Sequence, residues 1–148
     1  MPATLEEILL APETQPQVIA DCLTLIDAEL AEKSGISGSA LKLAYKTASS
    51  FASGYVRETV VNILPLAAAR LQPYWTDFRA AGGAEFGDYL AKRGEEVAES
   101  LLTITDGWAE ESDKAIVVKA YRAVRAGAAR HVEAALPRLG DLVFKHAG

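Results

Sequence analysis

The chain has 148 residues, of which half are hydrophobic and 24% are charged, and its formal net charge is −5. This length fits one domain with its own core, and the acidic balance disfavours general binding of nucleic acid or anionic membranes. The single cysteine, Cys22, excludes an internal disulfide and a cysteine-based zinc site, and its apolar helical surroundings predict a buried, unreactive thiol. The N-terminus lacks the features of a signal peptide, and no apolar run reaches membrane-spanning length, so we expect a cytoplasmic protein.

The first two predicted helices have clear start and stop signals. Thr4 and Glu7 have the spacing of a capping box, which opens a short helix over residues 5–10 that Pro12 stops. A second helix starts near Pro16, a residue suited to a first turn, and ends at Gly35 as its C-terminal cap.

Two longer helices follow. Ser37 or Ser39 caps the third, which runs to Gly54. The fourth covers residues 56–81, continues through two prolines that are expected to bend it, and ends at a pair of glycines. Five aromatic residues cluster around this glycine pair and are predicted to belong to the core, with a ligand cleft or a subunit contact as the alternative: Tyr74, Trp75, Phe78, Phe86 and Tyr89.

The second part of the chain predicts three more helices. A long fifth helix covers residues 86–104, Ser112 or Asp113 caps a sixth, and the last covers residues 128–145 with interruptions at a proline and a glycine. Hydrophobic residues do not alternate with a period of two over any long window. The sequence therefore predicts an all-α bundle of about six to seven helices.

Several segments of the second part repeat segments of the first in the same order. The offset is 79 residues for Leu23–Asp27 and Leu102–Asp106, 76 for Ala44–Lys46 and Ala120–Arg122, and 72 for Leu64-Pro65 and Leu136-Pro137. The offset changes only between helices, where changes of length cost little. We predict one domain over residues 1–148, formed by internal duplication of halves near 4–76 and 85–147 about a pseudo-twofold axis. Chance similarity between alanine- and leucine-rich helices is the alternative.

The repeated polar residues are candidate ligand-binding groups. Asp27 and Asp106 occupy equivalent places in the repeat, and two carboxylates across a twofold could form an acid/base or metal site. Structural roles are the favoured alternative. Neither His131 nor His146 follows a glutamate three residues earlier, so the Glu-x-x-His signature is absent and we predict no metal and no cofactor.

Tyr45-Lys46 and Tyr121-Arg122 form the second repeated pair of candidates. Both tyrosines lie on apolar helix faces, so each ring is expected in the core with its hydroxyl near the surface, and each cation is expected to reach solvent. On this interpretation, phenylalanine at either tyrosine position should be nearly neutral for stability.

The segment EKSGISGSALKLAYK, residues 32–46, contains a further candidate site. Gly38, Ser39 and Lys42 near a helix N-terminus could bind an anion through free backbone N–H groups. The spacing of a P-loop is not met, because Lys42 is four residues past Gly38. We favour a simple joint between two helices.

The segments VIADCLTLIDAELAEKSGISGSALKLAYK and HVEAALPRLGDLV together resemble a small bacterial all-helical family of unknown function. The resemblance spans most of the chain and implies a helical fold in a bacterial, cytosolic protein. It transfers no site residues.

These features lead to two functional hypotheses. The first is a non-enzymatic helical protein that binds a protein partner, itself, or a small ligand between its halves, without nucleic acid or membrane as partners. The alternative is a small enzyme or metalloprotein that uses Asp27, Asp106, Tyr45 and Tyr121. The hypotheses differ in whether those four side chains converge in a shared cleft.

Overall fold

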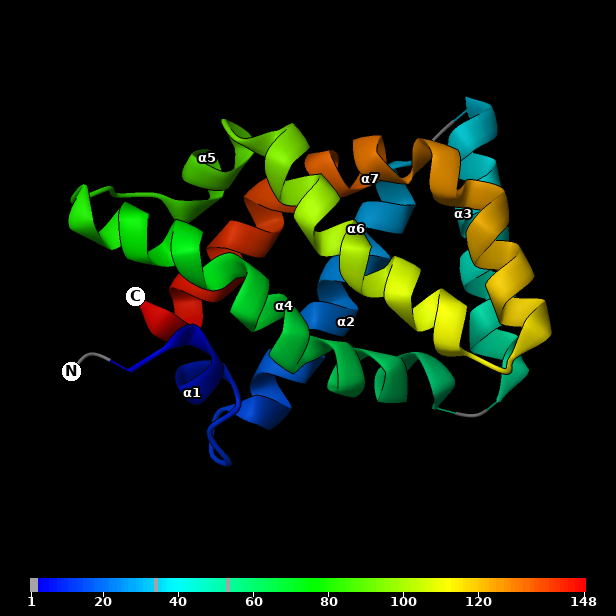
Figure 1. The fold of residues 1–148 in the computed structure, drawn as a ribbon, viewed down its shortest axis with the longest axis horizontal. Helices are drawn as coiled ribbons and strands as arrows, with labels where there is room; N and C mark the ends of the chain where they lie inside the picture. The colour runs from blue at the N-terminus through cyan, green and yellow to red at the C-terminus, as the bar shows by residue number, and fades with distance from the viewer. Residues whose placement is uncertain (1–2, 34, 53) are drawn as a thin grey trace.

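The computed structural model describes residues 3–33, 35–52 and 54–148, without the side chain of Ser37. These residues form seven helices and no strand, which confirms the predicted all-α class (Figure 1). The helices are α1 (Leu5–Leu9), α2 (Gln15–Glu32), α3 (Gly35–Phe51), α4 (Tyr55–Ala80), α5 (Phe86–Ala91), α6 (Gly94–Glu111) and α7 (Ala115–Ala147). Within this described part of the chain, no helix is both long enough and apolar enough to span a membrane.

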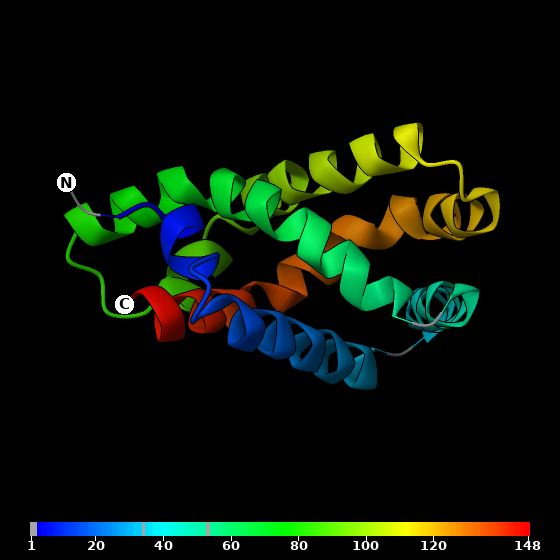
Figure 2. The same cartoon turned by 90° about the horizontal axis from the view of Figure 1, so that it is seen from below.

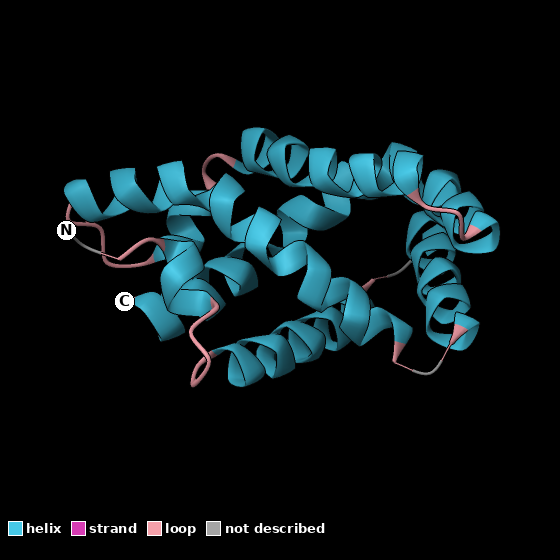
Figure 3. Cartoon of the chain, turned by 60° about the horizontal axis from the view of Figure 1, so that its bottom comes forward, coloured by secondary structure: helices cyan, strands magenta, loops and turns pink. Residues whose placement is uncertain are grey.

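The helices form an elongated bundle in which α7 contacts α1, α2, α3, α5 and α6. Figures 1 and 2 show α3 beside the first part of α7 at one end of the molecule, and both chain termini near the other end. Helices α4 and α6 run between the two ends, and Figure 3 shows that the connecting loops are short. Helix α4 changes direction along its course, as expected from Pro65 and Pro73 inside it.

The core lies near the end that holds the termini. Trp75 and Phe78 from α4 pack on Phe86 of α5, with ring centroids 5.0 and 5.1 Å from the Phe86 ring. All three are buried, and Phe144 of α7 meets the rings of α4 edge to face. The aromatic residues around the glycine pair therefore belong to the core, as predicted, and each fully buried ring contributes about 2–3 kcal/mol of apolar burial.

Helices α5 and α7 touch through their backbones at two buried glycines. A Cβ placed on Gly140 would lie 2.3 Å from the Cα of Gly87, and a Cβ on Gly87 would lie 2.5 Å from the Pro137 carbonyl oxygen. Only glycine allows this approach, because any side chain would push the two helices apart.

The connection between α2 and α3 is shorter than predicted. Helix α2 ends at Glu32 instead of Gly35, because Lys33 takes an extended backbone with φ −74° and ψ 141°. Gly35 has a positive φ of 75° and opens α3, so Ser39 lies inside that helix and does not cap it. Ser34 and the side chain of Ser37 lie outside the described residues.

The predicted fifth helix over residues 86–104 is wrong, because the chain breaks there into α5 and α6. Arg93 leaves the helical conformation, with φ −115° and ψ 28°. Its guanidinium lies 3.7 Å from the centre of the Tyr89 ring and donates to the Tyr89 carbonyl, which stabilises the break.

The predicted sixth and last helices are one helix, α7, and this boundary prediction was also wrong. Helix α7 continues through Gly127, where a break was expected, and through Pro137. Glycine and proline have low intrinsic helix propensity, but α7 packs against five other helices along its length, and tertiary packing supplies most of the stability of helices in proteins. Neither Ser112 nor Asp113 is the N-cap, which is Lys114, although the Ser112 hydroxyl accepts from the Lys114 N–H at 3.2 Å.

Candidate functional site

The repeated residues Asp106 and Tyr121 lie in one hydrogen-bonded cluster between α6 and α7. The Tyr121 hydroxyl lies 2.7 Å from Asp106 Oδ1 and 2.6 Å from the hydroxyl of Thr105. Arg125 holds both oxygens of Asp106 through Nε at 2.8 Å and Nη2 at 3.1 Å. Such a bidentate pair fixes the orientation of the Asp106 carboxylate and also compensates its negative charge.

Protonation in this cluster follows from these contacts. Burial, followed by the hydrogen bond to the Asp106 carboxylate, raises the pKa of Tyr121 to about 12, although Thr105 acts in the opposite direction. Hydrogen bonds from Arg125 and then Tyr121 lower the pKa of Asp106. At neutral pH the phenol therefore keeps its proton and the carboxylate is charged.

The first-half counterpart is much weaker. Tyr45 reaches Asp27 Oδ1 at 3.5 Å, the long limit of a hydrogen bond, and Asp27 is exposed. Lys46 and Arg122 both reach the surface, as expected. The structure thus brings each aspartate to the tyrosine of the next helix, and it does not bring the two pairs together.

The residues of the proposed anion site lie in the first turns of α3. Gly38 is buried against Lys33, whose carbonyl carbon would lie 2.9 Å from an added Cβ. Ser39 and Lys42 are exposed. Gly38 therefore has a packing role, and anion binding here stays a prediction.

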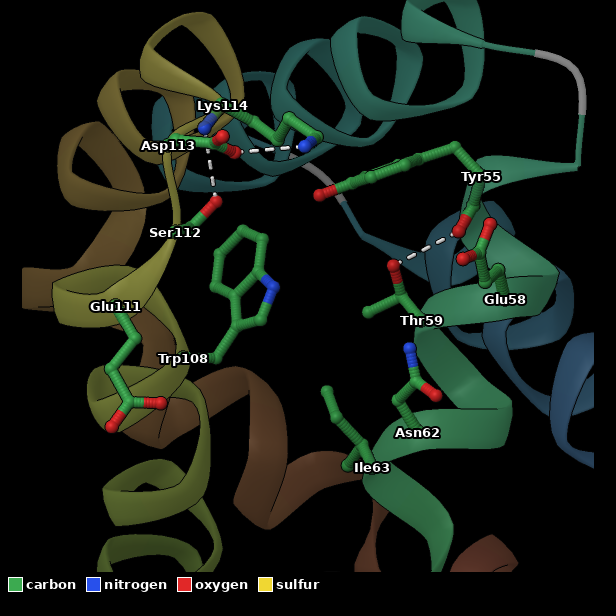
Figure 4. A pocket seen from close by; sticks show the side chains of 10 residues that line it. All are labelled: Tyr55, Glu58, Thr59, Asn62, Ile63, Trp108, Glu111, Ser112, Asp113 and Lys114. Atoms are coloured by element: carbon green, nitrogen blue, oxygen red, sulfur yellow. Dashed lines mark hydrogen bonds and ion pairs between the residues drawn. The ribbon is translucent and has the colours of Figure 1, made fainter.

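A cleft of about 460 Å³ lies between the N-terminal turns of α4 and the connection from α6 to α7 (Figure 4). One wall comes from α4, with Tyr55, Glu58, Thr59, Asn62 and Ile63, and the other from Trp108, Glu111, Ser112, Asp113 and Lys114. Small-molecule sites in proteins commonly have volumes of about 300–1,000 Å³. None of Asp27, Tyr45, Asp106 and Tyr121 lines this cleft.

Two aromatic side chains project into the cleft from opposite walls. In Figure 4 the Trp108 indole directs its N–H edge toward α4, and the Tyr55 hydroxyl points toward the Asp113–Lys114 pair. Each ring is supported from behind. Phe51 meets Tyr55 edge to face at 5.2 Å, and Tyr121 meets Trp108 edge to face at 6.0 Å. Such contacts hold aromatic rings in fixed orientations.

Negative charge predominates around the cleft. Lys114 is paired with Asp113 at 2.8 Å, whereas Glu58 and Glu111 have no ion-pair partner among the residues that the structure describes. Asp113 first, and then Tyr55 and Glu58, raise the pKa of Lys114. Figure 4 shows Glu58 beside Tyr55, and Glu111 at the rim with its carboxylate turned away from the indole.

Sequence reasoning missed both aromatic residues of the cleft. The sequence does contain a signal for Trp108. An offset of 79 residues aligns it with Glu29, so the two repeated segments differ in side-chain chemistry at this position. Glu29 is buried and is held by Lys33 at 3.1 Å and by Arg138. The aligned position therefore carries a buried ion-paired glutamate in one segment and a half-buried indole in the other.

The cluster of residues needed for a metal site is missing from the described part of the chain, where no three histidine, cysteine or acidic side chains converge. The Cys22 thiol packs against the core, and burial raises its pKa to about 11, as expected for an unreactive cysteine.

Comparison with known proteins gives one family. No curated protein and no solved structure matches the chain significantly. The family of unknown function DUF6918 matches residues 5–147, which is nearly the whole sequence. The chain therefore belongs to this family, DUF6918, whose function is unknown.

Proposed function

We propose that this protein is a non-enzymatic binding protein that holds a small organic ligand in the cleft between α4 and the α6–α7 connection. The observation that carries the proposal is the cleft itself, with about 460 Å³ of space and two aromatic rings supported on opposite walls. Supported aromatic side chains and a few polar groups are the usual composition of a ligand site.

We also propose that the fold arose by internal duplication, which would make this cleft a site between the two halves. Helices α2 and α6 both have 18 residues, and each follows a short helix. An aspartate near the end of each bonds to a tyrosine of the next helix. Leu64 and Leu136 are both buried and both precede a proline inside a helix. These correspondences support a common origin.

Divergence between the halves explains why one cleft is open. In the first half, Lys33, the residue that follows α2, contacts the carbonyl of His131 at 3.5 Å, and Arg138 binds Glu29 and Glu32. The offsets align Glu29 with Trp108 and His131 with Thr59, which both line the cleft. Among the described residues, no ion pair of this kind bridges Trp108 and Thr59, so the space between α4 and the α6–α7 connection stays open for a ligand.

The chemistry of the repeated residues favours binding over catalysis. Tyr121 keeps its proton up to a pKa of about 12, far from the range useful for acid/base catalysis at neutral pH. Asp106 is saturated by Tyr121 and Arg125. A role in positioning Trp108 accounts for these contacts, because Tyr121 packs against the indole while Asp106 and Arg125 hold Tyr121 in place.

A thermal-shift screen with a library of small metabolites tests the proposal, together with native mass spectrometry of the purified protein. A ligand at 100 times its dissociation constant stabilises by about 2.7 kcal/mol, which raises the melting temperature by several degrees. We expect hits that stabilise the wild type and the control Leu66→Ala, whose side chain is 53% exposed on α4 outside the cleft, but not Trp108→Ala. Hits that stabilise Trp108→Ala equally, or the absence of any hit or retained molecule, would show that the cleft is not a binding site.

A further inference from the structure

We infer that the cleft selects a small organic cation, a ligand with a substituted ammonium group, which would sit between Trp108 and Tyr55. This inference rests on the proposed binding function and adds the chemical class of the ligand. It is carried by the geometry of the two aromatic side chains and by the balance of charge around them.

The aromatic side chains supply the first part of the recognition. Tryptophan and tyrosine rings attract a cation to their faces, and aromatic cages are a recurrent solution for quaternary ammonium groups. The ammonium group would therefore lie over the face of Trp108 and not at the electropositive N–H edge that is turned toward α4. Trp108 and Tyr55 stand on opposite walls of the cleft, each held by a ring behind it. These contacts restrict the orientations of both rings before a ligand arrives, which reduces the entropy lost on binding.

The charges supply the second part. Among the residues that the structure describes, Lys114 is the one cation that lines the cleft, and Asp113 neutralises it through the 2.8 Å ion pair. Glu58 and Glu111 then leave the lining with a net charge of about −2, in a protein whose formal net charge is −5. An anionic ligand would meet repulsion here, whereas an ammonium group is attracted by the rings and by the Glu58 carboxylate beside Tyr55. Glu111, whose carboxylate is turned away from the indole, adds attraction at longer range.

Neutral ligands are distinguished from cations by this same arrangement. A neutral molecule of equal shape gains the apolar contact with Trp108 and Tyr55 but loses the attraction to Glu58. The preference for the cation should fall as salt is added, because Glu58 and Glu111 are exposed and screened.

Three probes of one shape test the inference: choline, its neutral isostere with carbon in place of nitrogen, and the tert-butylacetate anion. Binding is followed by tryptophan fluorescence, with Trp108→Phe to identify the signal of the cleft, since the other tryptophan, Trp75, is buried in the core. Titration calorimetry provides a second readout. We expect choline to bind about tenfold more tightly than the neutral isostere at low salt, and the anion to bind least.

Glu58→Gln should weaken choline binding about fivefold and leave the neutral isostere unchanged. Glu110→Gln is the matched control, because Glu110 is an exposed acid of α6 that does not line the cleft. Equal affinities for choline and its isostere, tighter binding of the anion, or no response to any probe would each overturn the cation assignment. The binding function would still stand in all three cases if the library screen gave hits that require Trp108.

Discussion

The Trp108 indole rests edge to face on the Tyr121 ring, with centroids 6.0 Å apart and ring planes at 85°. Behind this contact, Tyr121 is anchored by Thr105 and Asp106, and Asp106 in turn by Arg125. Tyr121 and Asp106, which belong to the repeated segments, thus position Trp108, which the repeat does not single out. The corresponding pair earlier in the chain, Asp27 and Tyr45, is joined by a single contact of 3.5 Å.

The hydrogen bonds of Tyr121 correct the expectation that phenylalanine is nearly neutral at both tyrosine positions. Replacing Tyr121 by phenylalanine should destabilise the protein, whereas the same change at Tyr45 should not. The Tyr121 hydroxyl makes two short hydrogen bonds, so its loss should lower the free energy of unfolding by about 1 kcal/mol. The Tyr45 hydroxyl makes one contact at 3.5 Å, and its loss should change stability by less than about 0.5 kcal/mol. Urea unfolding of both variants measures the difference. Equal effects would mean that the Asp106 cluster does not stabilise the fold.

Gly140→Ala should be strongly destabilising. Its new methyl group would meet the backbone of Gly87 at 2.3 Å, so α5 must move away from α7, at a cost of about 3 kcal/mol. Gly107→Ala is the matched control, since no atom lies within 4 Å of its added Cβ and helix propensity favours alanine by about 1 kcal/mol. Thermal unfolding should therefore shift in opposite directions. A neutral Gly140→Ala would contradict the backbone contact.

Arg138→Ala should lower stability by about 1–2 kcal/mol, because it leaves the buried Glu29 with Lys33 as its remaining partner. Arg122→Ala removes an exposed arginine of the same helix and should change stability by less than about 0.5 kcal/mol. A double-mutant cycle with Glu32→Ala measures how much of the effect comes from the exposed partner. Identical losses of stability for Arg138→Ala and Arg122→Ala would show that the ion pair between Arg138 and Glu29 does not stabilise the fold.

Stability should fall between about pH 5 and pH 2 because of Asp21. Burial raises its pKa, but hydrogen bonds from His146, Lys145 and Gln17 outweigh burial and lower the pKa from 3.8 to about 2. Above about pH 5 the carboxylate is charged in both the folded and unfolded chain, so its full contribution is present. As the pH falls, the unfolded chain takes up the proton first, and about 1–2 kcal/mol is lost.

The control for this acid effect is Asp21→Asn. It should be less stable than the wild type at pH 7 by a similar amount, and the difference should vanish near pH 2. Chemical denaturation at a series of pH values measures both limits. A constant difference down to pH 2 would mean that Asp21 is not stabilised by His146 and Lys145.

The sequence by itself determined the helical class and most of the helices. Thr4 and Glu7 form the capping box that their spacing predicts, and helix periodicity placed α2, α3 and α4 to within a few residues. The aromatic cluster around Phe86 was correctly assigned to the core. All of these features depend on interactions between residues near one another in the chain, or on the apolar content of one helix face.

The tertiary structure alone decided the helix breaks and the cleft. Arg93 stacks on Tyr89 where the helical pattern breaks, and α7, which packs against five other helices along its length, runs unbroken through Gly127. The cleft joins Tyr55 to Trp108, residues more than fifty positions apart, and periodicity carries no information about such a meeting. Whether a half-buried ring fills a core or lines a binding site depends on what faces it, and that is set by how the helices pack.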